Sequence, residues 1–245
     1  MISLPPLYGG NNSAAYGANN FGQIVGASET AALENNSNCA QEVLATQGAL
    51  WQPLRYKHAT ALPPVAGDTD SSAYAIDDHG DAAGASGSCI DFPPNADELH
   101  PVLWRNGKTV ALPTLGGTLD NAVNAINERG EMAGQSALTG NSTVHAAFWR
   151  SPRVITDLGT FPGDSYSLLF GINDEGQVVG GSGSQTNYRR WRIRCGDRSR
   201  RFVCRYSDGR TGESHTCKRG SSARSSCKRD AADQTIRPET VRFQR

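Results

Sequence analysis

The chain has 245 residues, with 24 Lys and Arg, 24 Asp and Glu, and a formal net charge of zero at pH 7. A chain of this length can bury one large or two small hydrophobic cores. No apolar run approaches the roughly 18 residues of a membrane-spanning helix. The N-terminus shows no secretion signal, so we expect the chain either to stay in the cytoplasm or to belong to a longer protein.

The even charge balance hides two different segments. Residues 1–187 contain 7 Lys and Arg against 18 Asp and Glu, a formal charge of −11. Residues 188–245 contain 17 basic and 6 acidic residues, a formal charge of +11, and four of the six cysteines. This composition predicts two parts, a repeat domain at 1–187 and a basic tail rich in Arg, Ser and Cys at 188–245.

A sixteen-residue pattern occurs four times in the first part, at residues 13–28, 71–86, 121–136 and 167–182. The first turn glycine of each copy follows the previous one by 58, 50 and 46 residues. The period is therefore about 46 residues with insertions in the earlier units, which is typical of repeat architectures.

Each copy begins with alternating apolar residues, which predicts a β-strand. A turn follows, opened by Asn or Asp and ended by Gly, as in a three-residue hairpin loop that requires positive φ at the glycine. The sequence therefore assigns a structural turn role to Gly22, Gly80, Gly130 and Gly176.

A second strand ends at another glycine in each copy, where a neighbouring backbone needs room. A third strand ends at Trp51, Trp104 or Trp149, and Asn106-Gly107 predicts the hairpin that leads into a fourth strand. Only residues 40–49 favour a short turn of helix.

Four short antiparallel strands per unit predict an all-β fold, a propeller-like array of four-stranded blades with three complete units and partial ones. Residues 2–7 are typical of a further strand. They could close a ring with the hairpin at 165–182 if residues 187–194 formed a strand. Because an arginine-rich run seldom fits a buried strand, an open array is favoured over the closed ring.

The runs AINERGEMAGQS (125–136), HAAFWR (145–150) and VITDLGTFPGDSYS (154–167) resemble the HAF family of extracellular repeat proteins, named for a His-Ala-Phe step. The resemblance covers about residues 2–182. It departs in the second unit, which reads HPVLW at 100–104, and in the first, which has Gly48 where His would fall. It implies a bacterial, exported or surface-associated protein with a propeller-like fold, and no particular activity.

Acidic residues recur in the loops after the fourth strands, at Asp68, Asp70, Asp120 and Asp164. If these loops share one face, their carboxylates could hold Ca²⁺ or a cationic ligand. Solvated turn residues are the favoured alternative, because the spacing lacks the ligand pattern of a dedicated calcium loop. No other cofactor is predicted.

His100 and His145 begin equivalent strands that end at tryptophans. They could contact a ligand, but residues repeated in every unit usually serve the unit itself. Cys39 and Cys89 lie in insertions of adjacent units and could form a disulfide in an oxidising compartment, or remain two free thiols.

The tail shows no strand or helix period and few aliphatic residues. Disorder or a shifted reading frame is favoured over a selected nucleic-acid-binding arm. Its cysteines (Cys195, Cys204, Cys217, Cys227) lack the close pair of a typical zinc site.

Catalytic sequence motifs are absent. The sequence therefore favours a non-catalytic scaffold or binding module that recognises a surface ligand or another protein. A propeller-type hydrolase with its site on the blade-loop face is the alternative, and nucleic acid is a partner only if the tail is functional.

Overall fold

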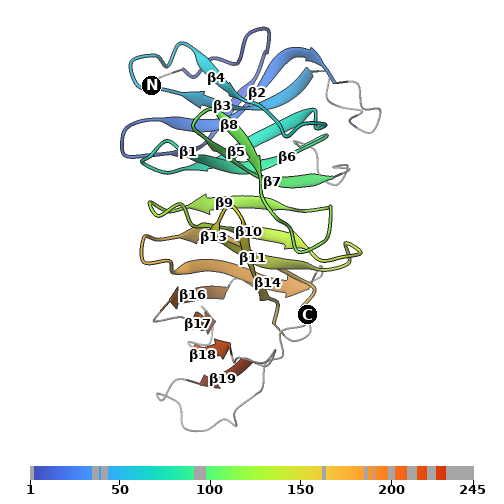
Figure 1. The fold of residues 1–245 in the computed structure, drawn as a ribbon, viewed down its shortest axis with the longest axis vertical. Coiled ribbons are helices and arrows are strands. Elements are labelled where there is room, and N and C mark those ends of the chain that lie inside the picture. The colour runs from blue at the N-terminus through green and yellow to red at the C-terminus, as the bar shows by residue number, and fades with distance from the viewer. Residues whose placement is uncertain are drawn as a thin grey trace.

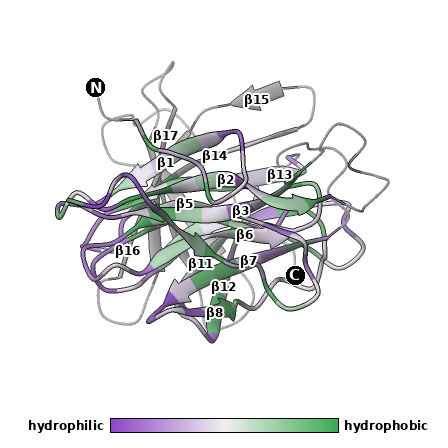
Figure 2. Cartoon of the chain, turned by 90° about the horizontal axis from the view of Figure 1, so that it is seen from above, coloured by the Kyte–Doolittle hydropathy of each residue, from purple (hydrophilic) through white to green (hydrophobic). Residues whose placement is uncertain are grey.

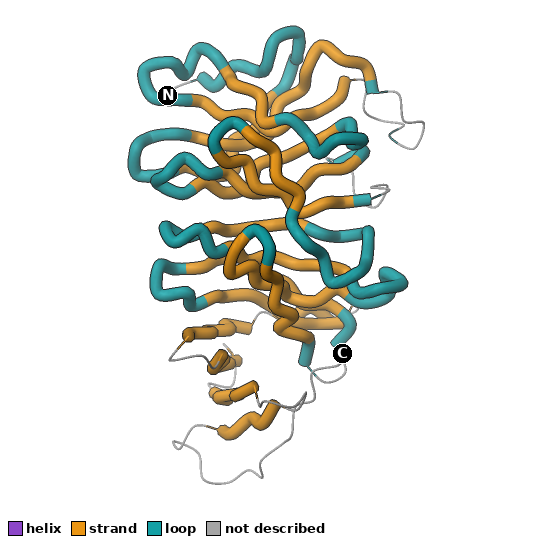
Figure 3. The backbone as a smooth tube through the Cα atoms, in the orientation of Figure 1, coloured by secondary structure: helices purple, strands orange, loops and turns teal. Residues whose placement is uncertain are grey.

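The chain forms an elongated stack of β-sheets in the computed structural model (Figure 1). The structure describes residues 3–34, 39, 44–90, 98–161, 164–184, 187–189, 191–197, 202–208, 214–219 and 225–229. Every regular element within these residues is a strand, as the tube in Figure 3 makes visible. The all-β class expected from the sequence is therefore confirmed.

Each of the first three units is an antiparallel meander of four consecutive strands, and a fourth unit has three. Unit one contains β1 (Ser13–Ala18), β2 (Ile24–Leu33), β3 (Leu44–Trp51) and β4 (Ala59–Leu62). Unit two contains β5 (Asp70–Ile76), β6 (Ala82–Gly87), β7 (Leu99–Arg105) and β8 (Lys108–Ala111). Unit three contains β9 (Ala122–Ile126), β10 (Met132–Ala137), β11 (Val144–Ser151) and β12 (Val154–Gly159). Unit four contains β13 (Tyr166–Ile172), β14 (Val178–Ser184) and β15 (Asn187–Arg189).

The units follow one another along the long axis of the molecule (Figure 1). Units three and four are also joined through one parallel pair, Val144 opposite Tyr166. Residues 3–7, expected to be a strand, are not in a sheet. They lie instead against unit one, where the Pro5 carbonyl accepts a hydrogen bond of 2.9 Å from Trp51 Nε1. The N-terminal segment therefore does not complete unit four, and the ring closure considered from the sequence is not formed.

The helical turn expected at residues 40–49 is not formed in the described part of that segment, residues 44–49. Residues 44–49, which favour a helical turn by local sequence, belong to β3 and pair with β2. Residues 40–43 lie outside the described part. Pairing with both neighbouring strands satisfies the backbone of β3, so tertiary context overrides the local preference.

The hairpin turns have the backbone geometry that the sequence predicts. The turn glycines Gly22, Gly80, Gly130 and Gly176 have φ of 75°, 83°, 70° and 73°. The Asn106-Gly107 turn has φ of 54° and 70°, as a type I′ hairpin requires.

A β-bulge interrupts the first hairpin of every unit. One extra residue of the first strand lies opposite the beginning of the second strand, at Tyr16, Tyr74, Asn124 and Phe170. The second-strand glycine faces this bulge at very short range. A Cβ atom built on Gly26, Gly84, Gly134 or Gly180 would lie 1.9, 1.9, 2.0 or 2.1 Å from a main-chain oxygen of the first strand. Only glycine fits there, because the obstructing atom belongs to the backbone.

The core lies between successive sheets, and neighbouring residues of a strand point into different interfaces. Ala82 packs towards unit one and Ala83 towards unit three. Trp104 and Trp149 fill equivalent places in these two interfaces. Seen along the stack, apolar colour follows many of the central strands while several turns are hydrophilic (Figure 2). The sheet of unit two therefore buries side chains on both of its faces, which explains why it needs its neighbours.

A serine two residues after the glycine of each second strand holds the segment that enters the unit. Its Oγ accepts a hydrogen bond from a backbone N–H located 21 residues earlier in every unit. The pairs are Leu7 with Ser28 (2.7 Å), Val65 with Ser86 (2.8 Å), Leu115 with Ser136 (2.9 Å) and Phe161 with Ser182 (3.1 Å). Ser71 and Ser167 add bridges between neighbouring units. Ser71 accepts from Gly48 N (3.0 Å) and donates to Leu62 O (2.7 Å).

Replacing Ser86 with Ala should destabilise the protein by about 1–3 kcal/mol, because the partly buried Val65 N–H loses its acceptor. Chemical denaturation measures the difference. Ser142→Ala, at an exposed loop position, is the matched control and should change stability by less than about 0.5 kcal/mol. Equal effects at the two positions would contradict the structural role of Ser86.

The turns are linked along one edge of the stack, where they lie above one another (Figure 3). In each case the second turn residue donates its backbone N–H to the side chain at the same position in the next unit. Asn20 donates to Asp78 Oδ1 (2.8 Å), Asp78 to Glu128 Oε2 (3.0 Å) and Glu128 to Asp174 Oδ1 (3.0 Å). These carboxylates fix the register between units.

The structure describes only part of the tail, residues 188–245. Its described segments form an antiparallel sheet of four strands, β16 (Trp191–Asp197), β17 (Phe202–Asp208), β18 (Ser214–Arg219) and β19 (Ser225–Arg229). The backbone register places Cys195, Cys204, Cys217 and Cys227 opposite one another in a single row. Successive cysteines are unevenly spaced along the chain, so the sequence pattern does not reveal this alignment.

Candidate functional site

The four predicted acidic residues do not converge on one site. Asp68 Oδ2 and Asp164 Oδ2 have equivalent roles, accepting hydrogen bonds from Ser86 Oγ (2.5 Å) and Ser182 Oγ (2.7 Å) in separate units. Asp120 accepts from Gln135 Nε2 at 3.2 Å in a third unit. Among the described residues, no three or more His, Cys, Asp and Glu side chains are grouped to hold a metal ion.

Asp70 lies at the contact between units one and two and is fully buried. Its Oδ1 accepts from Thr46 N (2.7 Å), and its Oδ2 accepts from Thr69 Oγ1 (2.9 Å) and Cys89 N (3.0 Å). Burial raises the pKa of Asp70 to about 6, with Glu34 acting in the same direction. Thr46 and Glu34 are far from Asp70 in sequence, and no local motif points to either.

The environment of His100 resembles that of a catalytic base. Its Nδ1 lies 3.0 Å from Asp68 Oδ2, and its side chain is 38% exposed. A carboxylate on Nδ1 fixes the tautomer of a neutral imidazole and leaves Nε2 as a base. The nearby Ser86 Oγ binds Asp68 rather than His100, so these three residues do not form a nucleophilic triad.

His145 has a different environment. Its Nδ1 lies 2.8 Å from Asp157 Oδ1, and its side chain is only 1% exposed. Each repeated tryptophan donates Nε1–H to a proline carbonyl, Pro5, Pro63 or Pro113, at 2.8–2.9 Å. The tryptophans thus serve the stack, as the sequence favoured. The histidines bind carboxylates of their own units.

Cys39 and Cys89 form a disulfide in the structure, linking the insertion of unit one to that of unit two. Their Cα atoms are 5.1 Å apart, within the range that a disulfide spans. The bond lies next to the Asp70 carboxylate, because Cys89 N donates to it.

Replacing both cysteines with serine should lower the free energy of unfolding by about 2–4 kcal/mol, because a crosslink over a sequence separation of 50 residues restricts the unfolded chain. Urea denaturation of the oxidised protein and the double variant measures this change. Unchanged stability would show that the bond is absent in solution.

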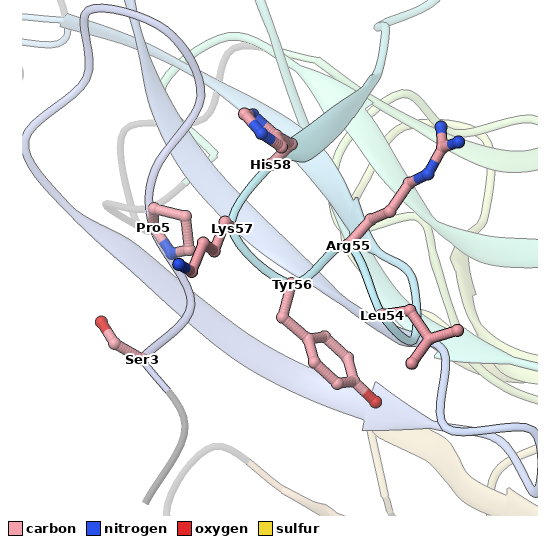
Figure 4. A pocket seen from close by; sticks show the side chains of 7 residues that line it. All are labelled: Ser3, Pro5, Leu54, Arg55, Tyr56, Lys57 and His58. Carbon is pink, nitrogen blue, oxygen red and sulfur yellow. The ribbon is translucent and has the colours of Figure 1, made fainter.

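A second candidate site lies at the loop of unit one that joins β3 to β4. This loop has seven residues between Trp51 and Ala59. The unit-two hairpin needs only two residues between Arg105 and Lys108. The longer loop borders an open hollow of about 980 Å³, which is lined by Ser3, Pro5, Leu54, Arg55, Tyr56, Lys57 and His58 (Figure 4).

Tyr56 anchors this loop. Its hydroxyl donates to Gly22 O at 2.7 Å, and its ring packs against the core cluster of unit one. Leu54 is fully exposed with φ of 63°. The charged ends of Arg55 and Lys57 point to opposite sides of the loop (Figure 4), so they do not converge on one anion.

Within the part of the chain that the structure describes, no helix is long and apolar enough to cross a membrane. Comparisons with protein-family models, curated proteins and solved structures found no match to this chain.

Proposed function

We propose that the chain is a non-catalytic β-repeat scaffold or binding module of an exported or cell-surface bacterial protein, with a propeller-like but open arrangement of blades. One observation carries this proposal. The recurring polar residues are occupied in holding the stack together, as the repeated serine of every second strand illustrates. Repeats whose conspicuous polar groups are used internally present extended surfaces rather than a reaction centre.

The resemblance to HAF repeats and the Cys39–Cys89 disulfide support the location outside the cytoplasm. Disulfides persist in oxidising compartments and are rare in the cytosol. The acidic charge of residues 1–187 favours a soluble, extended surface.

The ligand-binding face in this proposal is the edge of units one and two around Asp68 and His100. A partly exposed imidazole whose Nδ1 binds a carboxylate offers its Nε2 as a hydrogen-bond acceptor to a polar surface ligand, such as a glycan or a peptide. Screening the intact chain against glycan and peptide arrays, with and without Ca²⁺, should identify such a ligand. Titration calorimetry then gives its affinity.

His100→Ala should weaken a ligand found in this way at least tenfold, whereas His58→Ala, at the hollow of unit one, should leave its affinity unchanged. Weaker binding in His58→Ala and unchanged binding in His100→Ala would instead place the site at the hollow of unit one. Loss of affinity in neither variant would contradict both locations.

A hydrolase is the second candidate, because the Asp68–His100 pair has the geometry of an oriented general base. Turnover of ester, peptide or glycoside substrates that is lost in a folded His100→Ala variant would establish the enzyme and exclude the scaffold. DNA retention that requires residues 188–245 would instead assign binding to the basic tail.

A further inference from the structure

The first residue of every turn has the same side-chain orientation. Its Oδ1 accepts a hydrogen bond from the backbone N–H four residues later, which fixes where the other terminal atom points. The pairs are Asn19 with Gln23 (2.9 Å), Asp77 with Asp81 (2.9 Å), Asn127 with Glu131 (2.9 Å) and Asn173 with Gln177 (2.8 Å).

In units one and three, that other atom is an amide nitrogen that binds the next unit. Asn19 Nδ2 donates to Asp77 O, and Asn127 Nδ2 donates to Asn173 O, each at 2.9 Å. These bonds connect unit one to unit two and unit three to unit four. The equivalent bond from unit two to unit three would run from residue 77 to Asn127 O.

Asp77 carries an oxygen where the other turns carry this amide. The side chain of Asp77 is 1% exposed, and its Oδ2 has no hydrogen-bond partner. By equivalence with the turns of units one and three, this oxygen would be directed at the Asn127 carbonyl oxygen. Such a contact is unfavourable for a carboxylate, because both atoms only accept hydrogen bonds. A proton on Oδ2 removes the conflict.

We propose that Asp77 is protonated on Oδ2 and donates this proton to the main-chain oxygen of Asn127, so that a carboxylic acid replaces the amide of the other turns. The contact between units two and three then depends on pH.

The surrounding charges favour the protonated form. Burial raises the pKa of Asp77, and the carboxylates of Asp81 and Glu128 act in the same direction. Asp81 is itself bound to Arg105 Nε at 2.5 Å. Two groups oppose the rise in the pKa of Asp77: the Asp81 backbone N–H, which donates to Asp77 Oδ1, and His79. His79 Nδ1 lies 3.7 Å from Asp77 Oδ2 and 3.5 Å from Glu128 Oε2.

The raised pKa of Asp77 determines how the stability of the protein changes with pH. A carboxyl group whose pKa is raised by folding contributes its full stabilisation below the ordinary pKa of Asp. That stabilisation is lost as the pH rises through the raised value. The joint between units two and three therefore weakens towards alkaline pH.

The test compares the thermal midpoints of the full chain and of Asp77→Asn between pH 4 and pH 8. An amide donates at every pH, so the two proteins should melt together at pH 4, and the variant should melt about 2–4 °C higher at pH 8. Asp70 titrates equally in both proteins and cancels from the comparison. The proposal would be overturned if the difference between the two thermal midpoints did not change with pH. It would also be overturned if the variant melted at a lower temperature than the unchanged chain at pH 8.

Failure of Asp77→Asn to fold would also overturn it, because asparagine occupies this place in the other three units. His79→Gln separates protonation from an ion pair between His79 and Asp77. When both proteins also carry His79→Gln, the pH-dependent difference between their thermal midpoints should persist. Its disappearance would show that the imidazolium of His79, not a proton on Asp77, neutralises the carboxylate.

Discussion

Gly84→Ala should destabilise the protein by about 3 kcal/mol or more, enough to prevent folding at moderate temperature. The new Cβ would lie 1.9 Å from Ser72 O and 3.0 Å from Ala73 Cα. Both atoms belong to the backbone beside the bulge at Tyr74, so no side-chain rotation can relieve the overlap. The hairpin would have to separate or lose its bulge.

Gly107→Ala is the matched control, because it also places a Cβ on a glycine of unit two. Gly107 has φ of 70° and no neighbouring atom within 4 Å, so only the backbone conformation is penalised there. That penalty is about 1–2 kcal/mol. Urea denaturation of both variants separates the cost of steric overlap at Gly84 from the cost of backbone strain at Gly107. Comparable losses of unfolding free energy in the two variants would show that the close backbone approach at Gly84 does not determine the effect of the substitution.

Trp149→Ala should lower the free energy of unfolding by about 3–5 kcal/mol, the usual range for removing a fully buried tryptophan. The Trp149 side chain is buried between units two and three against Leu103 and Met132. Its Nε1 also donates to Pro113 O at 2.8 Å, which holds the segment entering unit three. The substitution therefore opens a cavity and releases that segment together.

Trp149→Phe separates these contributions. It retains most of the apolar volume but leaves Pro113 O without its donor, so we expect a loss of about 1–3 kcal/mol. Val154→Ala, at a position 50% exposed, should have little effect and serves as the control. Equal losses for Trp149→Ala and Trp149→Phe would attribute the whole effect to the hydrogen bond rather than to packing.

Features set by neighbouring residues were predictable from the sequence. The turn at residues 77–80 needs only an Asx side chain and a glycine with positive φ, and both conditions are local. The glycine at position 84 marked a close backbone approach for the same reason. Residues 44–49 were misjudged because their strand state depends on pairing with a segment earlier in the chain.

The partners of the site residues were not predictable. Asp68 and Asp70 are two residues apart, yet Asp68 binds His100 while Asp70 binds Thr46 of the preceding unit. These contacts span 32 and 24 residues. A signal did exist for the turn ladder, since an acidic residue recurs at the second turn position as Asp78, Glu128 and Asp174.

The sequence by itself determined the repeat, the strand order within each unit and the positions of the turn glycines, because these follow from periodicity and from backbone conformations that few residues adopt. Only the tertiary structure decided how the units meet: an extended stack with residues 3–7 on unit one, the Cys39–Cys89 link, and a buried Asp77 oxygen without a hydrogen-bond partner. Burial and hydrogen-bond partners between units depend on distances in space, and spacing along the chain does not specify them.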